Sequence, residues 1–176
     1  MSVKVQMRLE SSGDADPDAA AQELAARAEE VFARALERMF PEGALPPRAE
    51  VSLSFLPLER MREQNRTYRG IDEPTDVLSF PLWEEDGEFR PSCALPVLPL
   101  GDILICPEYV RSCTPDEDAF NREMALLVSH GFLHLLGWDH DNDEREAKMS
   151  RAAESLQNEL LAGHARGFAR LFEGEG

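Results

Sequence analysis

The sequence predicts one domain of the α+β or α/β class, with about four strands and four or five helices. Residues 3–9 and 49–56 alternate apolar with polar side chains, which is the period of a half-buried strand. Residues 18–40 lie between them, are rich in alanine and place apolar side chains at helical spacing. A helix that connects two strands in this way implies that at least some strands are parallel. The length of 176 residues fits a single domain.

The remaining elements are predicted in order along the chain. Asp16 is expected to cap the helix at 18–40, with Pro17 at its first position. Further strands are predicted at 76–82 and 98–106, and further helices at 57–68, 117–136 and 142–161. The polar, proline-rich residues 84–99 are expected to form a loop or a splayed hairpin. We therefore predict one domain over residues 1–162, followed by a tail at 163–176.

The formal net charge of −16 argues against nucleic-acid binding by the whole surface, but it leaves room for a local basic cleft. Most of the cations are arginines, which bind phosphate in a planar, bidentate way. The three cysteines form no CxxC pair and are expected to be reduced thiols of a cytoplasmic protein. The sequence has no signal-peptide pattern and no apolar run of membrane-spanning length, so we expect no membrane partner.

The segment HGFLHLLGWDH, residues 130–140, contains three of the four histidines. His130 and His134 are four residues apart, so a helix places both imidazoles on one face. Gly137 readily ends a helix in a left-handed conformation, and a chain that turns back there brings His140 toward the same point. Three converging imidazoles predict a site for a divalent transition metal, most simply Zn²⁺. The fourth coordination position would be open, as in catalytic zinc sites.

The histidine segment leaves alternatives open. An HxxxH pair alone is more often a surface or core feature, but a third histidine at this spacing favours metal binding. The long zincin pattern HExxHxxGxxH has the same spacing, with glutamate as the general base. Gly131 occupies that position, which argues against such a protease and favours a reaction such as phosphodiester hydrolysis. Another metal hydrolase would need a base such as Glu123, and a non-catalytic structural zinc would need a fourth ligand such as Cys106 or Cys113.

The second distinctive segment is NRTYRGIDEPTDVLSFP, residues 65–81. Arg69 falls where a helix gives way to a loop, so it either binds the last helix carbonyls or points its guanidinium at a phosphate. A local basic path and a solvated helix face are equally simple roles for its neighbours Arg60, Arg62 and Arg66.

Other side chains around this segment also have two candidate roles. Asp76 and Ser79 either shape a cleft or make local hydrogen bonds with the backbone. Tyr68 and Trp83 are candidates for stacking on nucleobases, although core packing is the simpler role for both. A narrow cleft with aromatic stacking would favour single-stranded nucleic acid.

The two segments, together with the Gly101-Asp-Ile triplet between them, resemble the YbeY endoribonuclease family of bacterial rRNA maturation factors over residues 56–160. The resemblance implies that one zinc ion per chain is bound by His130, His134 and His140, and that Arg69 is catalytic. It also implies an α+β fold, in which a small mixed four-stranded sheet packs with about five helices. The metal site is then expected at the end of a central helix.

The same resemblance implies a function and partners. Members of the family are endoribonucleases specific for single-stranded RNA, and they act in maturation of the 3′ end of 16S rRNA and in ribosome quality control. We therefore expect single-stranded RNA, rRNA and the small ribosomal subunit as partners in the cytoplasm, and no DNA. Zinc is expected to lower the pKa of a bound water, and Arg69 to stabilise charge on the phosphate oxygens. Attack by hydroxide and attack by the RNA's own 2′-OH both stay open.

Overall fold

The structure is a computed structural model that describes residues 2–10 and 19–162. Its strands are β1 (Lys4–Glu10), β2 (Arg48–Phe55), β3 (Val77–Pro81), β4 (Glu84–Glu85), β5 (Glu88–Phe89) and β6 (Leu98–Ile105). Its helices are α1 (Ala19–Met39), α2 (Leu58–Arg69), α3 (Pro107–Cys113), α4 (Glu117–Leu135) and α5 (Asp143–Leu161). The predictions for Asp16, Pro17 and the tail at 163–176 lie outside the described residues.

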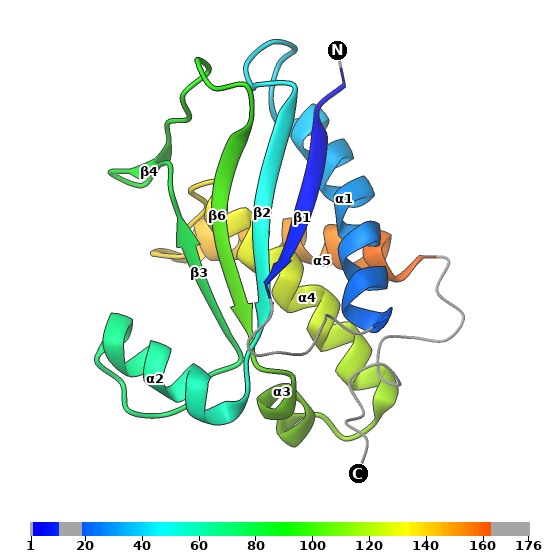
Figure 1. The fold of residues 1–176 in the computed structure, drawn as a ribbon, viewed down its shortest axis with the longest axis vertical. Helices are drawn as coiled ribbons and strands as arrows, with labels where there is room; N and C mark the ends of the chain where they lie inside the picture. The colour runs from blue at the N-terminus through cyan, green and yellow to red at the C-terminus, as the bar shows by residue number, and fades with distance from the viewer. Residues whose placement is uncertain (1, 11–18, 163–176) are drawn as a thin grey trace.

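The main sheet has the strand order β1-β2-β6-β3 (Figure 1). β1 pairs with β2 and β2 with β6 in parallel, whereas β3 runs antiparallel to β6. The first two strands are joined by α1, so the parallel pairing expected from the alternating and helical patterns is present. Within the described residues, the predicted α+β fold with a mixed sheet of four strands and five helices is confirmed.

A short helix and a short hairpin refine the prediction. The sequence pattern does not locate α3, because its seven residues make fewer than about two helical turns and display no clear period. Pro107 stands at the first position of this helix, directly after β6. Between β3 and β6, the strands β4 and β5 form a small hairpin whose turn residues, Asp86 and Gly87, have positive φ. Of the two alternatives for this region, the hairpin is therefore correct at residues 84–89.

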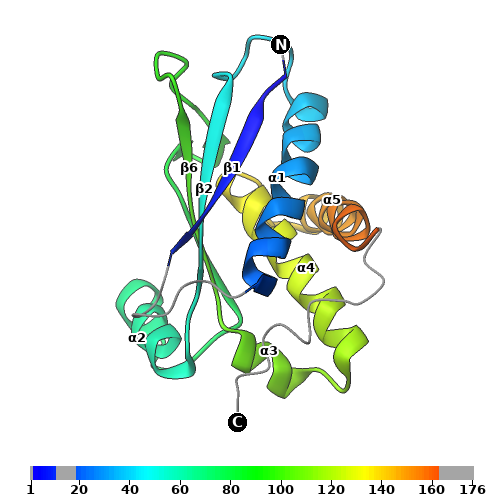
Figure 2. The same cartoon turned by 45° about the vertical axis from the view of Figure 1, so that its right-hand side comes forward.

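The helices are distributed unequally over the main sheet. α1, α4 and α5 lie on one side of it, whereas α2 lies on the other side near one end (Figures 1 and 2). Ala49, Val51 and Leu53 are buried on one face of β2, and the residues between them are only half-buried. Phe32 of α1 stacks on Phe132 of α4 with ring centroids 3.9 Å apart, which joins these two helices in the core. Within the described residues, no helix combines the length and hydropathy that a membrane span requires.

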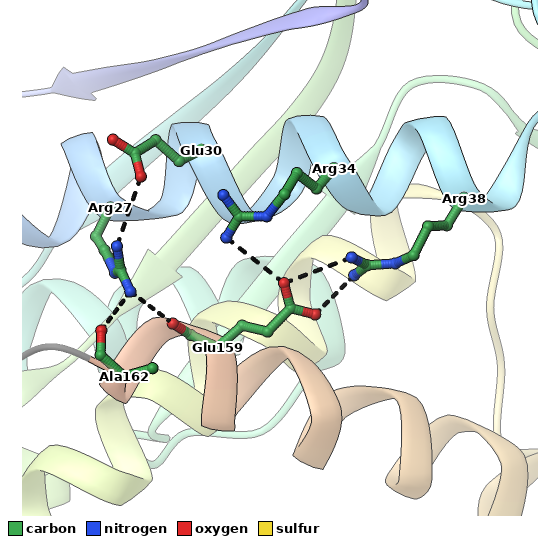
Figure 3. A network of polar contacts seen from close by, with 6 residues as sticks. All are labelled: Arg27, Glu30, Arg34, Arg38, Glu159 and Ala162. Atoms are coloured by element: carbon green, nitrogen blue, oxygen red, sulfur yellow. Dashed lines mark hydrogen bonds and ion pairs between the residues drawn. The ribbon is translucent and has the colours of Figure 1, made fainter.

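Polar contacts attach α5 to α1 (Figure 3). The carboxylate of Glu159 in α5 pairs with Arg34 and Arg38 of α1, at 3.6 and 2.7 Å. Arg27 donates hydrogen bonds to the backbone carbonyls of Glu159 and Ala162 at the end of α5. Because the last carbonyls of a helix have no partner within it, Arg27 acts as a C-terminal cap. These contacts anchor the helix that follows the loop containing the third histidine of the 130–140 segment.

Candidate active site

The end of α4 has the turn that the sequence predicts. Gly137, just after the helix, has a φ of 77°. Its N–H donates to the carbonyl of His134, and the N–H of Trp138 donates to the carbonyl of Leu133 at 3.1 Å. These two hydrogen bonds define a Schellman motif, which ends the helix and reverses the chain. The reversal brings His140 back toward the last turns of α4.

The three histidines expected to converge do so. His130, His134 and His140 each offer one ring nitrogen, and these atoms all lie within 4.8 Å of one another. The Nε2 atoms of His130 and His134 are 2.9 Å apart. The Nδ1 of His134 is 2.9 Å from the carbonyl oxygen of Trp138, and it carries the proton because a carbonyl oxygen can only accept. The lone pair of His134 is therefore on Nε2, the atom that faces His130.

The protonation of His130 and His134 suits metal binding. Burial, and secondarily the neighbouring His134 and His140, lowers the pKa of His130 from 6.5 to about 4. Burial, and then the nearby His140, also lowers the pKa of His134. Both rings are consequently neutral at pH 7, which is the form that binds metals. The residues present can thus hold a divalent transition metal with imidazole nitrogens.

A cavity of about 340 Å³ lies beside the histidines. Residues from α2, α4, β3, the loop preceding β3 and the loop following α4 line it, namely Arg69, Asp76, Val77, Ser79, Leu126, Leu127, His130, Gly131, His134 and His140. The structure thus brings Arg69 and the three histidines, which are far apart in sequence, to one cavity. Asp76 and Ser79 also line it, so the predicted contribution of these two residues to a cleft is confirmed.

The connection from α2 to β3 explains how Arg69 reaches this cavity. Gly70 follows it with a φ of 71°, a conformation that glycine adopts without strain, and ends the helix. Asn65 is buried in α2, and its Nδ2 donates to the carbonyl of Glu73 at 2.8 Å. The side chain of Asn65 therefore ties the end of the helix to the loop that leads into β3.

Asp76 is held at the cavity by local hydrogen bonds. Its Oδ1 accepts the N–H of Val77 at 2.7 Å and the hydroxyl of Thr75 at 3.1 Å. The negative charge of Asp76 partly opposes the lowering of the His130 pKa. Both predicted roles of this residue are therefore met, because its local hydrogen bonds fix a carboxylate that borders the cavity.

The four arginines of α2 differ in their partners. Arg62 forms a bidentate pair with Asp72, with N···O distances of 3.0 Å. Arg66 lies 3.9 Å from the same carboxylate, and Arg60 pairs with Glu63 within the helix. These three form the solvated helix face rather than a free basic path.

Arg69 has no acidic partner in the part of the chain that the structure describes. The N–H groups of Gly70 and Ile71 bind the carbonyls of Arg66 and Asn65 in the last turns of α2. Among the described residues, the side chain of Arg69 makes no hydrogen bond to a helix carbonyl. Its positive charge contributes to the lowered pKa of His134. The guanidinium is therefore exposed, uncompensated by a carboxylate and close to the histidines, as a phosphate-binding group would be.

The structure tests the predicted roles of three other side chains, Trp83, Tyr68 and Glu123, and the result differs for each. Trp83 packs against the main core and donates from Nε1 to the carbonyl of Pro99 at 2.6 Å, so its predicted core role is confirmed. Tyr68 is 63% exposed, so core packing was the wrong role for it. Glu123 does not line the cavity, and burial, followed by the charge of Asp76, raises its pKa.

Gly131 has a packing role that the sequence analysis missed. A Cβ atom at this position would lie 3.0 to 3.3 Å from three side-chain carbons of Ile103 in β6. The absence of a side chain therefore lets α4 approach the sheet closely, in addition to removing the general base of the zincin pattern. A glycine within an otherwise apolar helix is the sequence signal that indicates such close packing.

Fold and site together define a class of protein. It is an α+β protein with a three-histidine group at the end of its central helix. This group can hold a metal, and it lies beside a cavity that an arginine also lines. The chain belongs to the YbeY family, because the family profile described as "Endoribonuclease YbeY" matches residues 16–161. The resemblance carried by the two sequence segments is thus confirmed.

Individual relatives agree with this membership. The chain is 47% identical over 120 residues to Endoribonuclease YbeY of Shouchella clausii, covering 65% of this chain and 74% of that protein. It is 44% identical over 128 residues to Endoribonuclease YbeY of Geobacillus thermodenitrificans, covering 69% and 81%. A solution structure of a Thermotoga maritima protein is similar at 26% identity, with a TM-score of 0.56 over 89% of both chains.

Proposed function

We propose that this protein is a zinc-dependent endoribonuclease specific for single-stranded RNA. It acts in rRNA processing, including maturation of the 3′ end of 16S rRNA, and in ribosome quality control. The observation that carries the proposal is that three converging imidazoles border one cavity together with an arginine that has no acidic partner among the described residues. Membership in the YbeY family supports the substrate class. Its partners are then rRNA and the small ribosomal subunit, in the cytoplasm.

In this proposal His130, His134 and His140 hold one Zn²⁺ per chain. When bound, the ion supplies Lewis acidity, which activates a nucleophile and offsets negative charge on the phosphate. The protein keeps His130 and His134 neutral by burial and fixes His134 through the carbonyl of Trp138. A ligand oriented in this way loses little freedom when the ion binds.

Arg69 is the proposed catalytic residue of the chain. Its guanidinium borders the cavity and can donate two parallel hydrogen bonds to the oxygens of a phosphodiester. Negative charge on those oxygens grows as the phosphorus is attacked, so a fixed cation stabilises the transition state more than the ground state. Removing one such group typically lowers kcat by about 10²- to 10³-fold.

Two alternative functions have less support. A peptidase-like hydrolase needs a general base, but Gly131 has no side chain and Glu123 does not line the cavity. A purely structural zinc prefers four protein ligands. Within the described residues, the group of potential ligands contains only the three histidines, and Cys106 is buried in a separate cluster with Met61 and Leu78.

The proposal is tested by metal analysis followed by cleavage. Purified protein should contain about one zinc per chain, and His134→Ala should lose it while retaining the circular dichroism of a folded protein. Arg69→Ala should cleave single-stranded RNA about 10²- to 10³-fold more slowly with its zinc retained. Arg60→Ala, a matched exposed arginine already paired with Glu63, should cleave normally.

One further measurement separates the endoribonuclease from the peptidase-like hydrolase. Precursor 16S rRNA and casein are incubated with equal amounts of the zinc-loaded protein. Cleavage of the RNA near the 16S 3′ end supports the proposed function, whereas digestion of casein alone favours the hydrolase alternative. Equal zinc content in the native protein and His134→Ala would overturn the ligand set.

A further inference from the structure

Tyr68, immediately before Arg69 in sequence, is a large aromatic side chain left 63% exposed. Its ring lies against Phe80 of β3, with centroids 4.7 Å apart and planes inclined by 58°. Phe80 in turn packs against the small cluster under α2 formed by Met61, Leu78 and Cys106. One side of the tyrosine ring therefore packs against Phe80, and much of the side chain is open to solvent.

Tyr68 and the histidines lie on opposite sides of β3. Successive side chains of a strand point to opposite faces of the sheet. Val77 and Ser79 line the cavity with the histidines, so Phe80 points to the other face. Leu82, which is 57% exposed, lies two residues after Phe80 and therefore points to the same face. An apolar, partly exposed strip thus lies across the strand from the proposed catalytic site.

The strand between them is the edge of the sheet. β3 is the last strand in the order β1-β2-β6-β3, and in the described residues it pairs only with β6. A ligand can therefore pass over the other edge of β3 from one face of the sheet to the other. Pro81 in β3 has no N–H to offer for pairing, as is usual for an edge strand.

Because the protein is strongly acidic, a contact that does not rely on charge is useful for binding RNA. The chain has a net charge of −16, and three of the four arginines of α2 are compensated by carboxylates. Within α2, the cation that remains to attract a polynucleotide is accordingly Arg69. Stacking of a base on an aromatic ring supplies affinity that does not depend on charge or on base identity.

We propose that Tyr68, supported by Phe80, is a stacking platform for one base of the RNA, and that the RNA crosses the free edge of β3 to place its next phosphate at Arg69. This inference rests on the proposed function and adds a substrate-positioning residue to it. A base stacked on Tyr68 has left its own helix, so a duplex cannot make this contact. The platform therefore selects single strands.

The test measures binding separately from cleavage. Zinc-loaded protein is titrated with a fluorescent single-stranded oligonucleotide whose linkages resist cleavage, at several salt concentrations. Tyr68→Ala should weaken binding about 5- to 100-fold with an unchanged salt slope, and Tyr68→Phe should bind nearly as the native protein does. Arg69→Ala should instead reduce the salt slope by about 0.7. Leu95→Ala, which removes an exposed apolar side chain of another loop, should bind normally.

A second arm identifies the base. A series of oligonucleotides, each lacking one base, should contain one member that the native protein binds as weakly as Tyr68→Ala binds the intact strand. Tyr68→Ala should lose no further affinity for that member. If the native protein cleaves RNA but Tyr68→Ala binds the intact strand undiminished, the platform is overturned and the proposed function stands. If the native protein neither binds nor cleaves single-stranded RNA, both are overturned.

Discussion

The Nδ1 of His134 lies 2.9 Å from the carbonyl oxygen of Trp138, four residues further along the chain. This contact exists because the turn after α4 reverses the backbone so that a carbonyl points back at the helix. The same turn therefore both fixes the tautomer of one histidine and returns His140 to the site. The geometry of the candidate metal group depends on one backbone conformation, at Gly137.

Gly137→Ala should damage both the fold and metal binding. A Cβ atom here would lie 2.9 Å from the backbone nitrogen of Phe89, and the φ of 77° is strained for alanine. We expect a loss of about 2 kcal/mol in the free energy of unfolding and about 10- to 100-fold weaker zinc binding. Urea denaturation and competition with a zinc chelator measure the two effects.

Gly43→Ala is the matched control for this substitution. Gly43 has a similar φ of 82°, but a Cβ there would meet no atom of the described residues within 4 Å. It should be destabilised by about 1 kcal/mol through backbone strain alone and bind zinc normally. Equal zinc affinity in Gly137→Ala and the native protein would contradict the role given to the turn.

Asn65→Ala should loosen the connection that presents Arg69. The substitution removes the partly buried hydrogen bond to the carbonyl of Glu73 and leaves that carbonyl without its side-chain partner. We expect unfolding to become easier by about 1 to 3 kcal/mol, measured by urea denaturation. Thr67→Ala, at an exposed position of the same helix, should change stability by less than about 0.5 kcal/mol. A stable Asn65→Ala protein with normal RNA cleavage would show that the tie is dispensable.

The stability of the metal-free protein should rise with pH between about 4 and 6.5. His130 has a pKa of about 4 when folded, against an ordinary value of 6.5, so the unfolded chain binds more protons in this window. The contribution of His130 to the free energy of unfolding is fully present above pH 6.5 and is lost as the pH falls toward 4. Its size is on the order of 2 kcal/mol, because the ring is partly exposed to solvent.

The variant His130→Gln provides the comparison for the pH effect. Without the imidazole, the rise in the free energy of unfolding between pH 4 and 6.5 should be smaller than in the native protein. Other carboxylates titrate in both proteins, so only the difference between the two curves is informative. Superimposable curves from chelator-treated samples would refute the lowered pKa of His130.

Gly131→Glu should destabilise the protein rather than create a peptidase. The added side chain would begin within 3.0 to 3.3 Å of Ile103 and bring a carboxylate into the buried contact between α4 and β6. Overpacking of this kind costs about 1 to 3 kcal/mol, and the buried charge adds to it. Thermal unfolding and a casein assay check both parts. A variant of native stability that digests casein would refute the packing role.

Much of the secondary structure is predictable because it is local. The periods at 3–9 and 18–40 are properties of neighbouring residues, and the corresponding elements β1 and α1 form where expected. The helix α3 is not predictable in this way, since it is too short to display a period. The strand order β1-β2-β6-β3 depends on pairing between distant segments, which a pass along one sequence does not reveal.

The sequence by itself determined that three imidazoles would converge, because the histidines lie within eleven residues and helix geometry and one glycine set their positions. Only the tertiary structure decided which of Arg62, Arg66 and Arg69 remains available, since this depends on where the loop after α2 places the carboxylate of Asp72. It also decided that Tyr68 is exposed and that Gly131 is crowded, because burial is a property of the packed elements. Local spacing thus specified the candidate ligands, and long-range packing specified the cavity around them.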